Sequence, residues 1–150
     1  MWQLRPYRLY FLKDGPEIDN VILYTDGASR GNPGPAAIGA VLKDVKGNLL
    51  ARISRRIGTT TNNQAEYSAV IEALKKAVSL GARNVELRAD SELIVRQING
   101  RYRVKNAALR PLYQEVVKLI GSLDNFKAIS IPRTQNSEAD RLANMAFDGG

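Results

Sequence analysis

The sequence predicts an α/β domain built on a five-stranded mixed sheet with helices on both faces. Three apolar, β-branched runs follow one another before any helical pattern appears, and after residue 63 helical patterns alternate with two further short strand runs. Consecutive short strands form an antiparallel meander, whereas strands joined by helical crossovers add in parallel. The chain has 150 residues and 44% hydrophobic composition, which is enough for one such domain with a single core.

Five short runs rich in β-branched and apolar residues predict the strands, at residues 21–25, 37–43, 49–57, 85–89 and 127–131. Between the first two, residues 27–35 are rich in glycine, proline and asparagine and predict a loop. Lys46-Gly47-Asn48 predicts a hairpin turn between the second and third strands. The first three strands therefore form the meander.

Four segments carry apolar side chains at helical spacing. The predicted helices run from a polar loop at 58–63 to about residue 80, from Ser91 to about residue 98, between 109 and 123, and from Ser137 onward. Ser91 and Ser137 are predicted as N-caps, Pro111 lies in a first turn, and Gly81 ends the first helix. The apolar stripe of that first helix consists of Ala69, Val70, Ala73, Leu74, Ala77 and Val78.

Residues 1–20 differ in composition from the rest of the chain and are interpreted as an N-terminal arm or an added strand before a catalytic domain at 21–150. The segment mixes aromatic with basic residues, namely Trp2, Tyr7, Tyr10 and Phe11 with Arg5, Arg8 and Lys13. These residues suit stacking or phosphate contact with nucleic acid. The alternative, which we favour, is that Trp2, Leu9 and Phe11 pack on the domain.

Composition restricts the chemistry that the chain can perform. There are 22 Lys and Arg against 15 Asp and Glu, a net charge of +7, and a basic protein of this kind often binds nucleic acid. The absence of Cys and His excludes disulfides, zinc–thiolate sites, thiol nucleophiles and imidazole bases. No apolar run is long enough to span a membrane and no secretory signal is visible, so we expect a cytoplasmic protein.

Four acidic residues occupy positions where apolar side chains are expected. Asp26 and Asp90 end predicted strands, and Glu66 and Asp140 lie in first helical turns on packed faces. Half-buried carboxylates are costly unless they are paired or bind a cation, and Mg²⁺ or Mn²⁺ prefers carboxylate oxygens. Alternatively, each acid alone is a strand-end polar residue or a favourable charge at a helix N-terminus. Their spacing does not show that they converge.

Four blocks resemble, in order, the signature blocks of type 1 ribonuclease H (ribonuclease HI). They are TDGASRGNPGP at 25–35, TNNQAEYSAVIEAL at 61–74, ADSELIVRQING at 89–100 and NSEADRLAN at 136–144. The resemblance implies the ribonuclease H-like fold and an endonuclease that hydrolyses the RNA strand of RNA–DNA hybrids. It also implies two Mg²⁺ ions, with Mn²⁺ as a substitute, and products with 5′-phosphate and 3′-hydroxyl ends.

The same resemblance implies roles for individual residues. Asp26 corresponds to the aspartate that bridges both metals, Glu66 and Asp90 to ligands on the nucleophile side, and Asp140 to the acid on the leaving-group side. Asn32, Asn62 and Asn63 correspond to readers of the RNA strand, and Thr61 and Asn106 to a pocket for a DNA-strand phosphate; Ser91 lies beside Asp90. Alternatively, Asn32 is a turn residue, and Asn62, Asn63 and Ser91 are helix caps.

Two features depart from the family pattern. Many members carry a histidine in the loop before the last aspartate; here residues 132–135 occupy that loop, and Arg133 is either its electrostatic stand-in or a solvated loop arginine. Some members insert a basic protrusion, which is absent or minimal here, and Arg101, Arg103 and Lys105 are candidates to replace part of it.

Two other functions remain open on the sequence. A non-catalytic hybrid-binding module would gain nothing from four acids next to phosphates. A nuclease of the same fold that cuts double-stranded RNA or DNA junctions fits the acids equally well, but the three asparagines favour the hybrid. We expect a monomer, and the sequence leaves open whether double-stranded RNA is a second substrate.

Overall fold

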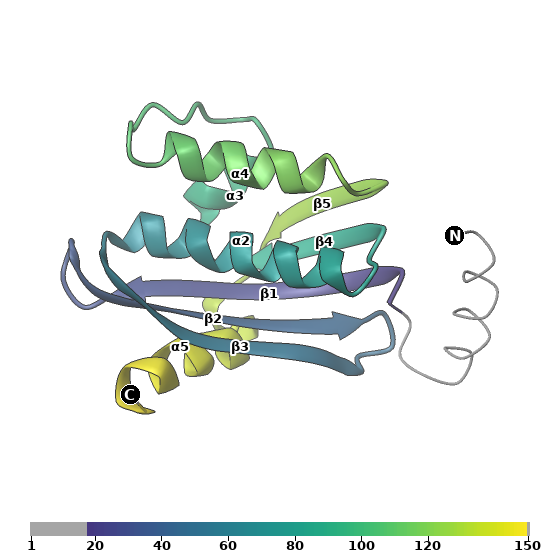
Figure 1. Ribbon diagram of the computed structural model, residues 1–150, viewed down its shortest axis with the longest axis horizontal. Helices are drawn as coiled ribbons and strands as arrows, with labels where there is room; N and C mark the ends of the chain where they lie inside the picture. The colour runs from purple at the N-terminus through teal and green to yellow at the C-terminus, as the bar shows by residue number, and fades with distance from the viewer. Residues whose placement is uncertain (1–17, 150) are drawn as a thin grey trace.

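The computed structural model describes residues 18–149 and consists of a central sheet between helices (Figure 1). The strand order is β3-β2-β1-β4-β5. The strands are β1 (Asn20–Ser29), β2 (Gly34–Asp44), β3 (Leu49–Thr60), β4 (Asn84–Ala89) and β5 (Asn125–Ser130). β1, β2 and β3 pair antiparallel, whereas β4 pairs in parallel with both β1 and β5. The predicted α/β class, with its meander and two parallel strands, is confirmed.

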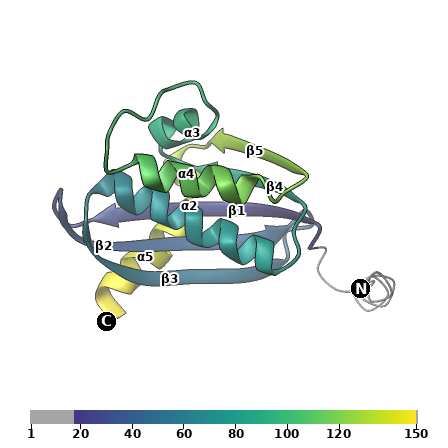
Figure 2. The same cartoon turned by 45° about the horizontal axis from the view of Figure 1, so that its top comes forward.

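Helices cover both faces of the sheet (Figures 1 and 2). They are α2 (Asn62–Ser79), α3 (Glu92–Ile98), α4 (Arg110–Ile120) and α5 (Ser137–Gly149), with a short 3₁₀ turn at Arg133–Gln135. α2 and α4 pack together on one side, and α5 lies across β1, β2 and β3 on the other. None of the helices within residues 18–149 is long and apolar enough to cross a membrane.

The main core lies between α2 and the sheet. Its fully buried members come from β1, β2, β4 and α2 and also from α3 and α4, among them Leu23, Leu74, Leu87 and Val116. The predicted apolar stripe of α2 is buried as expected, except that Val78 is only partly covered. This packing fixes α2 against β1, and the start of α2 is therefore held at the end of the sheet where β1 and β4 finish.

The first and third strands are longer than the sequence predicts. β1 continues past Asp26 to Ser29, because residues 26–29 pair with residues 36–39 of β2. β3 likewise continues to Thr60, so half of the loop predicted at 58–63 is strand, its last two residues belong to α2, and only Thr61 separates the two elements. Local composition suggested loops in both places; pairing with β2 supplies the hydrogen bonds that make them strands.

Three boundaries near the C-terminus also differ from prediction. β5 ends at Ser130, so Ile131 lies outside it, and α4 ends at Ile120, before Leu123. Ser137 is the first residue of α5 rather than its cap. Asn136 takes the cap position instead, since its backbone carbonyl accepts the N–H of Asp140 at 3.1 Å.

The predicted arm at residues 1–20 lies mostly outside the described residues, and its role stays a prediction. The carbonyl of Asp19 accepts the backbone N–H groups of Arg83 and Asn84 at 2.9 Å each. Asn20 already belongs to β1. The folded domain therefore includes residues just before the predicted boundary at 21.

Candidate active site

Asp26, Glu66 and Asp90 come together at one end of the sheet. Each offers a carboxylate oxygen, and the three oxygens lie within 4.8 Å of one another. Asp26 belongs to β1 and Asp90 directly follows β4; these strands are parallel neighbours that pair Thr25 with Ala89. The two aspartates therefore reach the same edge, as expected for parallel strands.

Glu66 reaches the cluster because β1 passes very close to the start of α2. A Cβ atom on Gly27 would overlap the backbone carbonyl of Ala65, so only glycine fits there. The N–H of Gly27 donates to Oε1 of Glu66 at 3.1 Å. Gly27 was not predicted as a site residue; nothing in the local sequence distinguishes it from other turn-forming glycines.

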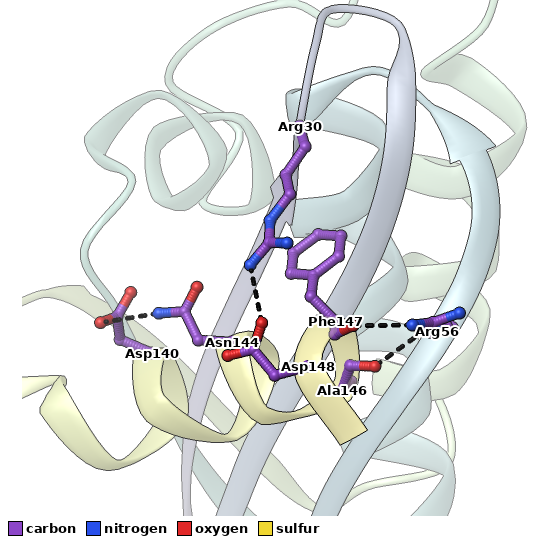
Figure 3. A network of polar contacts seen from close by, with 7 residues as sticks. All are labelled: Arg30, Arg56, Asp140, Asn144, Ala146, Phe147 and Asp148. Carbon is purple, nitrogen blue, oxygen red and sulfur yellow. Dashed lines mark hydrogen bonds and ion pairs between the residues drawn. The ribbon is translucent and has the colours of Figure 1, made fainter. Parts of the chain in front are cut away.

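Asp140 approaches Asp26 from the opposite face of the sheet. It lies in the first turn of α5 and comes within hydrogen-bonding reach of the Asp26 side chain. Nδ2 of Asn144 donates to Oδ2 of Asp140 at 3.4 Å (Figure 3). The guanidinium of Arg133 lies 4.0 Å from Oδ1 of Asp140 and its side chain is 83% exposed. All four predicted acids thus gather around Asp26.

The cluster is short of positive charge. Burial raises the pKa of Asp26 to about 7, and the neighbouring Asp90 and Asp140 add to the rise. Burial also raises the pKa of Glu66 well above its ordinary value, with repulsion from Asp26 and Asp90 in the same direction. Arg133 opposes both changes, and so does the Gly27 N–H at Glu66, but neither prevails.

This arrangement fits a hard divalent cation. Asp26 and Glu66 are only 8% and 7% exposed, and charged groups so buried are costly without a counter-charge. The donor set consists of carboxylate oxygens, which Mg²⁺ and Mn²⁺ prefer. Neither charge has an ion pair with a lysine or arginine within the described part of the chain. A bound cation would supply the missing charge.

Asn136 connects the strand that carries Asp26 with the helix that carries Asp140, and it was not predicted as a site residue. It is 1% exposed, and its Nδ2 donates to the carbonyl of Thr25, the residue before Asp26, at 2.8 Å. Its backbone carbonyl accepts the N–H of Asp140, which is the first hydrogen bond of α5. The sequence did contain a signal, because asparagine before a helix is a preferred N-cap; we had assigned the cap to Ser137.

Asn136→Ala is expected to lower the free energy of unfolding by about 1–3 kcal/mol, because it removes the buried hydrogen bond to the Thr25 carbonyl. Urea unfolding measures this. Asn99→Ala is the matched control: Asn99 makes the same type of bond, to the carbonyl of Ala128 at 3.0 Å, but from an exposed position. Equal losses in the two variants would contradict the role given to Asn136.

Five of the six predicted substrate-contact residues line one cavity next to the start of α2, and Ser91 is not among its lining residues. This cavity of about 370 Å³ is lined by Asn32, Thr61, Asn62, Asn63, Asn106, Ala108 and Leu109. The amide groups connect the loops around it: Oδ1 of Asn32 accepts the N–H of Asn62 at 2.9 Å, and Oδ1 of Asn62 accepts the N–H of Ser29 at 3.3 Å. The structure therefore brings together residues that are far apart in sequence.

Several of these residues also have structural tasks. The hydroxyl of Thr61 accepts the N–H of Gln64 at 3.2 Å, which makes Thr61 the N-cap of α2. Oδ1 of Asn106 accepts the N–H groups of Ala108 and Leu109. The hydroxyl of Ser91 caps α3 through the N–H of Ile94 at 3.4 Å, as the capping alternative predicts. Roles of these side chains toward a substrate stay predictions.

Comparison with known sequences places this geometry in a family. A family model described as Reverse transcriptase-like matches residues 24–146. Ribonuclease HI of Halobacterium salinarum is 44% identical over 125 residues, which make up 83% of this chain and 63% of that protein. A bifunctional protein of Mycobacterium tuberculosis is 43% identical over 129 residues, 85% of this chain and 35% of its own. The chain thus spans less than two thirds of these relatives.

Solved structures agree over nearly their whole length. RNase H1 of Halobacterium salinarum aligns with a TM-score of 0.85 and 43% identity, covering 87% of this chain and 99% of that one. The LC11-RNase H1 isolated from compost, in complex with an RNA/DNA hybrid, aligns with a TM-score of 0.82 and 46% identity, covering 86% and 97%. With four acids gathered at the expected end of this fold, the chain belongs to the type 1 ribonuclease H family.

Proposed function

We propose that this protein is an endonuclease that hydrolyses the RNA strand of RNA–DNA hybrids with divalent cations, leaving 5′-phosphate and 3′-hydroxyl ends. The observation that carries the proposal is the convergence of Asp26, Glu66 and Asp90 within 4.8 Å, with Asp140 beside Asp26. A binding module would gain nothing from this cluster, because carboxylates repel phosphates. The family membership and the hybrid-bound relative support the substrate.

Asp26, Glu66, Asp90 and Asp140 are the residues that would hold two Mg²⁺ ions, with Mn²⁺ as a substitute. When bound, such ions neutralise the phosphate, activate water and stabilise the departing oxygen. The carboxylates act by holding positive charge at the phosphate, with Asp26 central because the other three acids surround it. The carboxyl groups of Asp26 and Glu66 must be deprotonated to bind a cation. Occupancy of the metal site should therefore fall as the pH drops below about 7, the pKa to which burial raises Asp26.

Asn32, Asn62 and Asn63 are proposed to read the 2′-hydroxyl groups of the RNA strand, and Thr61 and Asn106 to hold a phosphate of the DNA strand. Only 2′-hydroxyls distinguish RNA from DNA along a strand, and amide groups can both donate to and accept from them. The shared cavity of about 370 Å³ supports these assignments. Ser91 is proposed as a minor contact beside Asp90, in addition to its capping bond.

One cleavage assay tests the proposal. Three duplexes of the same sequence, RNA–DNA hybrid, double-stranded RNA and double-stranded DNA, are incubated with the protein in Mg²⁺ and in excess chelator. We expect cleavage of the hybrid RNA strand in Mg²⁺, slower cleavage of double-stranded RNA, and none in chelator. Cleavage of the DNA duplex at an equal rate, or of the hybrid in chelator, would contradict the proposed function.

Arg133 is proposed to contact the scissile phosphate from its exposed position 4.0 Å from Asp140. Arg133→Ala should lower kcat/KM roughly tenfold, the loss expected for one charge-assisted hydrogen bond. Steady-state cleavage of the hybrid measures this. Arg141→Ala, an exposed arginine on α5, is the control. Unchanged kinetics in Arg133→Ala would exclude Arg133 from the mechanism.

The monomeric state and the cytoplasmic location are also proposals. The net charge of +7 favours a nucleic-acid partner and self-repulsion between copies. Light scattering of the purified chain tests the monomeric state: a mass near 16.5 kDa is expected, and a stable multiple of it would contradict the monomer.

A further inference from the structure

A row of polar side chains runs along α5 away from the carboxylate cluster. Asp140, Asn144 and Asp148 follow one another at intervals of four residues, so they share one face of the helix. Figure 3 shows this row, with Asn144 donating to Asp140 at one end and Arg30 reaching Asp148 at the other. The spacing places Asp148 about 12 Å from Asp140 along the helix axis.

Arg30 comes from the turn between β1 and β2, two residues before Asn32. Its backbone is fixed by a bond from its N–H to the carbonyl of Pro35 at 2.7 Å. Its guanidinium lies 4.1 Å from the centre of the Phe147 ring and 3.3 Å from Oδ1 of Asp148 (Figure 3). The guanidinium thus already binds a carboxylate oxygen, and phosphate oxygens suit the same planar set of donors.

The ion pair between Arg30 and Asp148 is not what holds α5 in place. Arg56 binds the end of this helix separately, with Nε donating to the carbonyl of Ala146 at 2.9 Å and a guanidinium nitrogen donating to the carbonyl of Phe147 at 2.7 Å. Phe147 is itself buried. The side chains of Arg30 and Asp148 are 55% and 72% exposed, and such pairs contribute little to stability.

A phosphate strand that approaches four carboxylates needs cations nearby. Arg133 lies at the Asp140 end of the row, and Arg30 lies at the far end. We propose that Arg30 contacts a phosphate of the RNA strand, away from the scissile one, and that Asp148 occupies Arg30 in the free protein as a carboxylate in place of that phosphate. This inference rests on the proposed function, since the strand beside Asn32 is there assigned as RNA.

Opposite effects of two substitutions test the proposal. Binding of a labelled RNA–DNA hybrid is measured by fluorescence anisotropy in chelator, at several salt concentrations, so that no cleavage occurs. Arg30→Gln should weaken binding roughly tenfold and reduce the slope of log affinity against log salt by about 1. Asp148→Asn should tighten binding about two- to fivefold, because the competing carboxylate is removed.

Arg83 and Asp124 supply matched controls. They form an exposed pair at 3.8 Å, with 49% and 65% exposure, at the opposite ends of the strands from the cluster. Arg83→Gln and Asp124→Asn make the same charge changes and should leave affinity nearly unchanged. Thermal unfolding of all four variants reports on folding.

The results separate the alternatives. If Arg30→Gln matches Arg83→Gln, or if Asp148→Asn weakens binding or leaves it unchanged, the proposal is overturned and the two residues form only an exposed ion pair. If both effects appear as expected while the unaltered protein fails to cleave the hybrid in Mg²⁺, the contact stands and the proposed function fails.

Discussion

Replacing Asp26 with Asn is expected to lower the rate of hybrid cleavage in Mg²⁺ by at least about a thousandfold, equivalent to about 4 kcal/mol of lost transition-state stabilisation. The amide keeps the size and shape of the side chain but removes the charge that the other three acids surround. Because Asp26 lies within 4.8 Å of Glu66 and Asp90 and within reach of Asp140, its loss affects every cation position. Single-turnover cleavage at saturating Mg²⁺ measures the chemical step.

Asp44→Asn is the matched control for that substitution. Asp44 is also buried, but it accepts hydrogen bonds from Lys46 and Asn48 in the β2–β3 turn. Activity per folded molecule should be unchanged in Asp44→Asn. Retention of near-normal cleavage by Asp26→Asn would show that the carboxylate cluster is not the catalytic site.

The stability of the metal-free protein is expected to fall as the pH rises from about 4 to about 7. Burial and the neighbouring acids raise the pKa of Asp26 from 3.8 to about 7, so the folded state binds more protons than the unfolded state across that window. The stabilisation from the protonated carboxyl is therefore complete below the unfolded pKa and is lost as the pH rises through the folded pKa, by roughly 4 kcal/mol. The raised pKa of Glu66 acts in the same direction.

Urea unfolding in chelator at pH 4.5 and pH 7.5 measures this loss, and Asp26→Asn isolates its source. The asparagine does not titrate, so the variant should depend less on pH and be more stable than the unaltered protein at pH 7.5. Mg²⁺ should restore stability at pH 7.5 in the unaltered protein and much less in Asp26→Asn. If the stability of the two proteins depended equally on pH, the pKa of Asp26 would not be raised in the folded protein.

Local patterns were sufficient to predict the sheet and its helices. Alternation and β-branched residues marked β1, β2 and β4, and the stripe from Ala69 to Ala77 identified the buried face of α2. The predicted strand ends were wrong where pairing with another strand determines them. Residues 26–29 contain glycine and small polar side chains, yet they belong to β1 because they pair with β2. The composition of a segment does not show which strand it will pair with in the sheet.

The four acids that the structure brings together were singled out from the sequence, but their geometry was not predictable from it. The sequence placed Asp26 and Asp90 at strand ends, and the parallel pairing of β1 with β4 brings them together. The strand order that creates this pairing is a property of the whole fold. For the same reason the contacts of Asn136 with Thr25 and of Arg30 with Asp148 were not predicted. Arg30 and Asp148 are 118 positions apart, and neither belongs to a pattern that predicts the other.

Anomalous X-ray scattering from Mn²⁺ in crystals of the protein tests most directly whether the carboxylate cluster is a metal centre. We expect anomalous peaks in contact with Asp26, Glu66 and Asp90, and on the side of Asp26 that faces Asp140. Crystals that contain Mn²⁺ at other surface carboxylates while these four residues remain free of it would contradict the account.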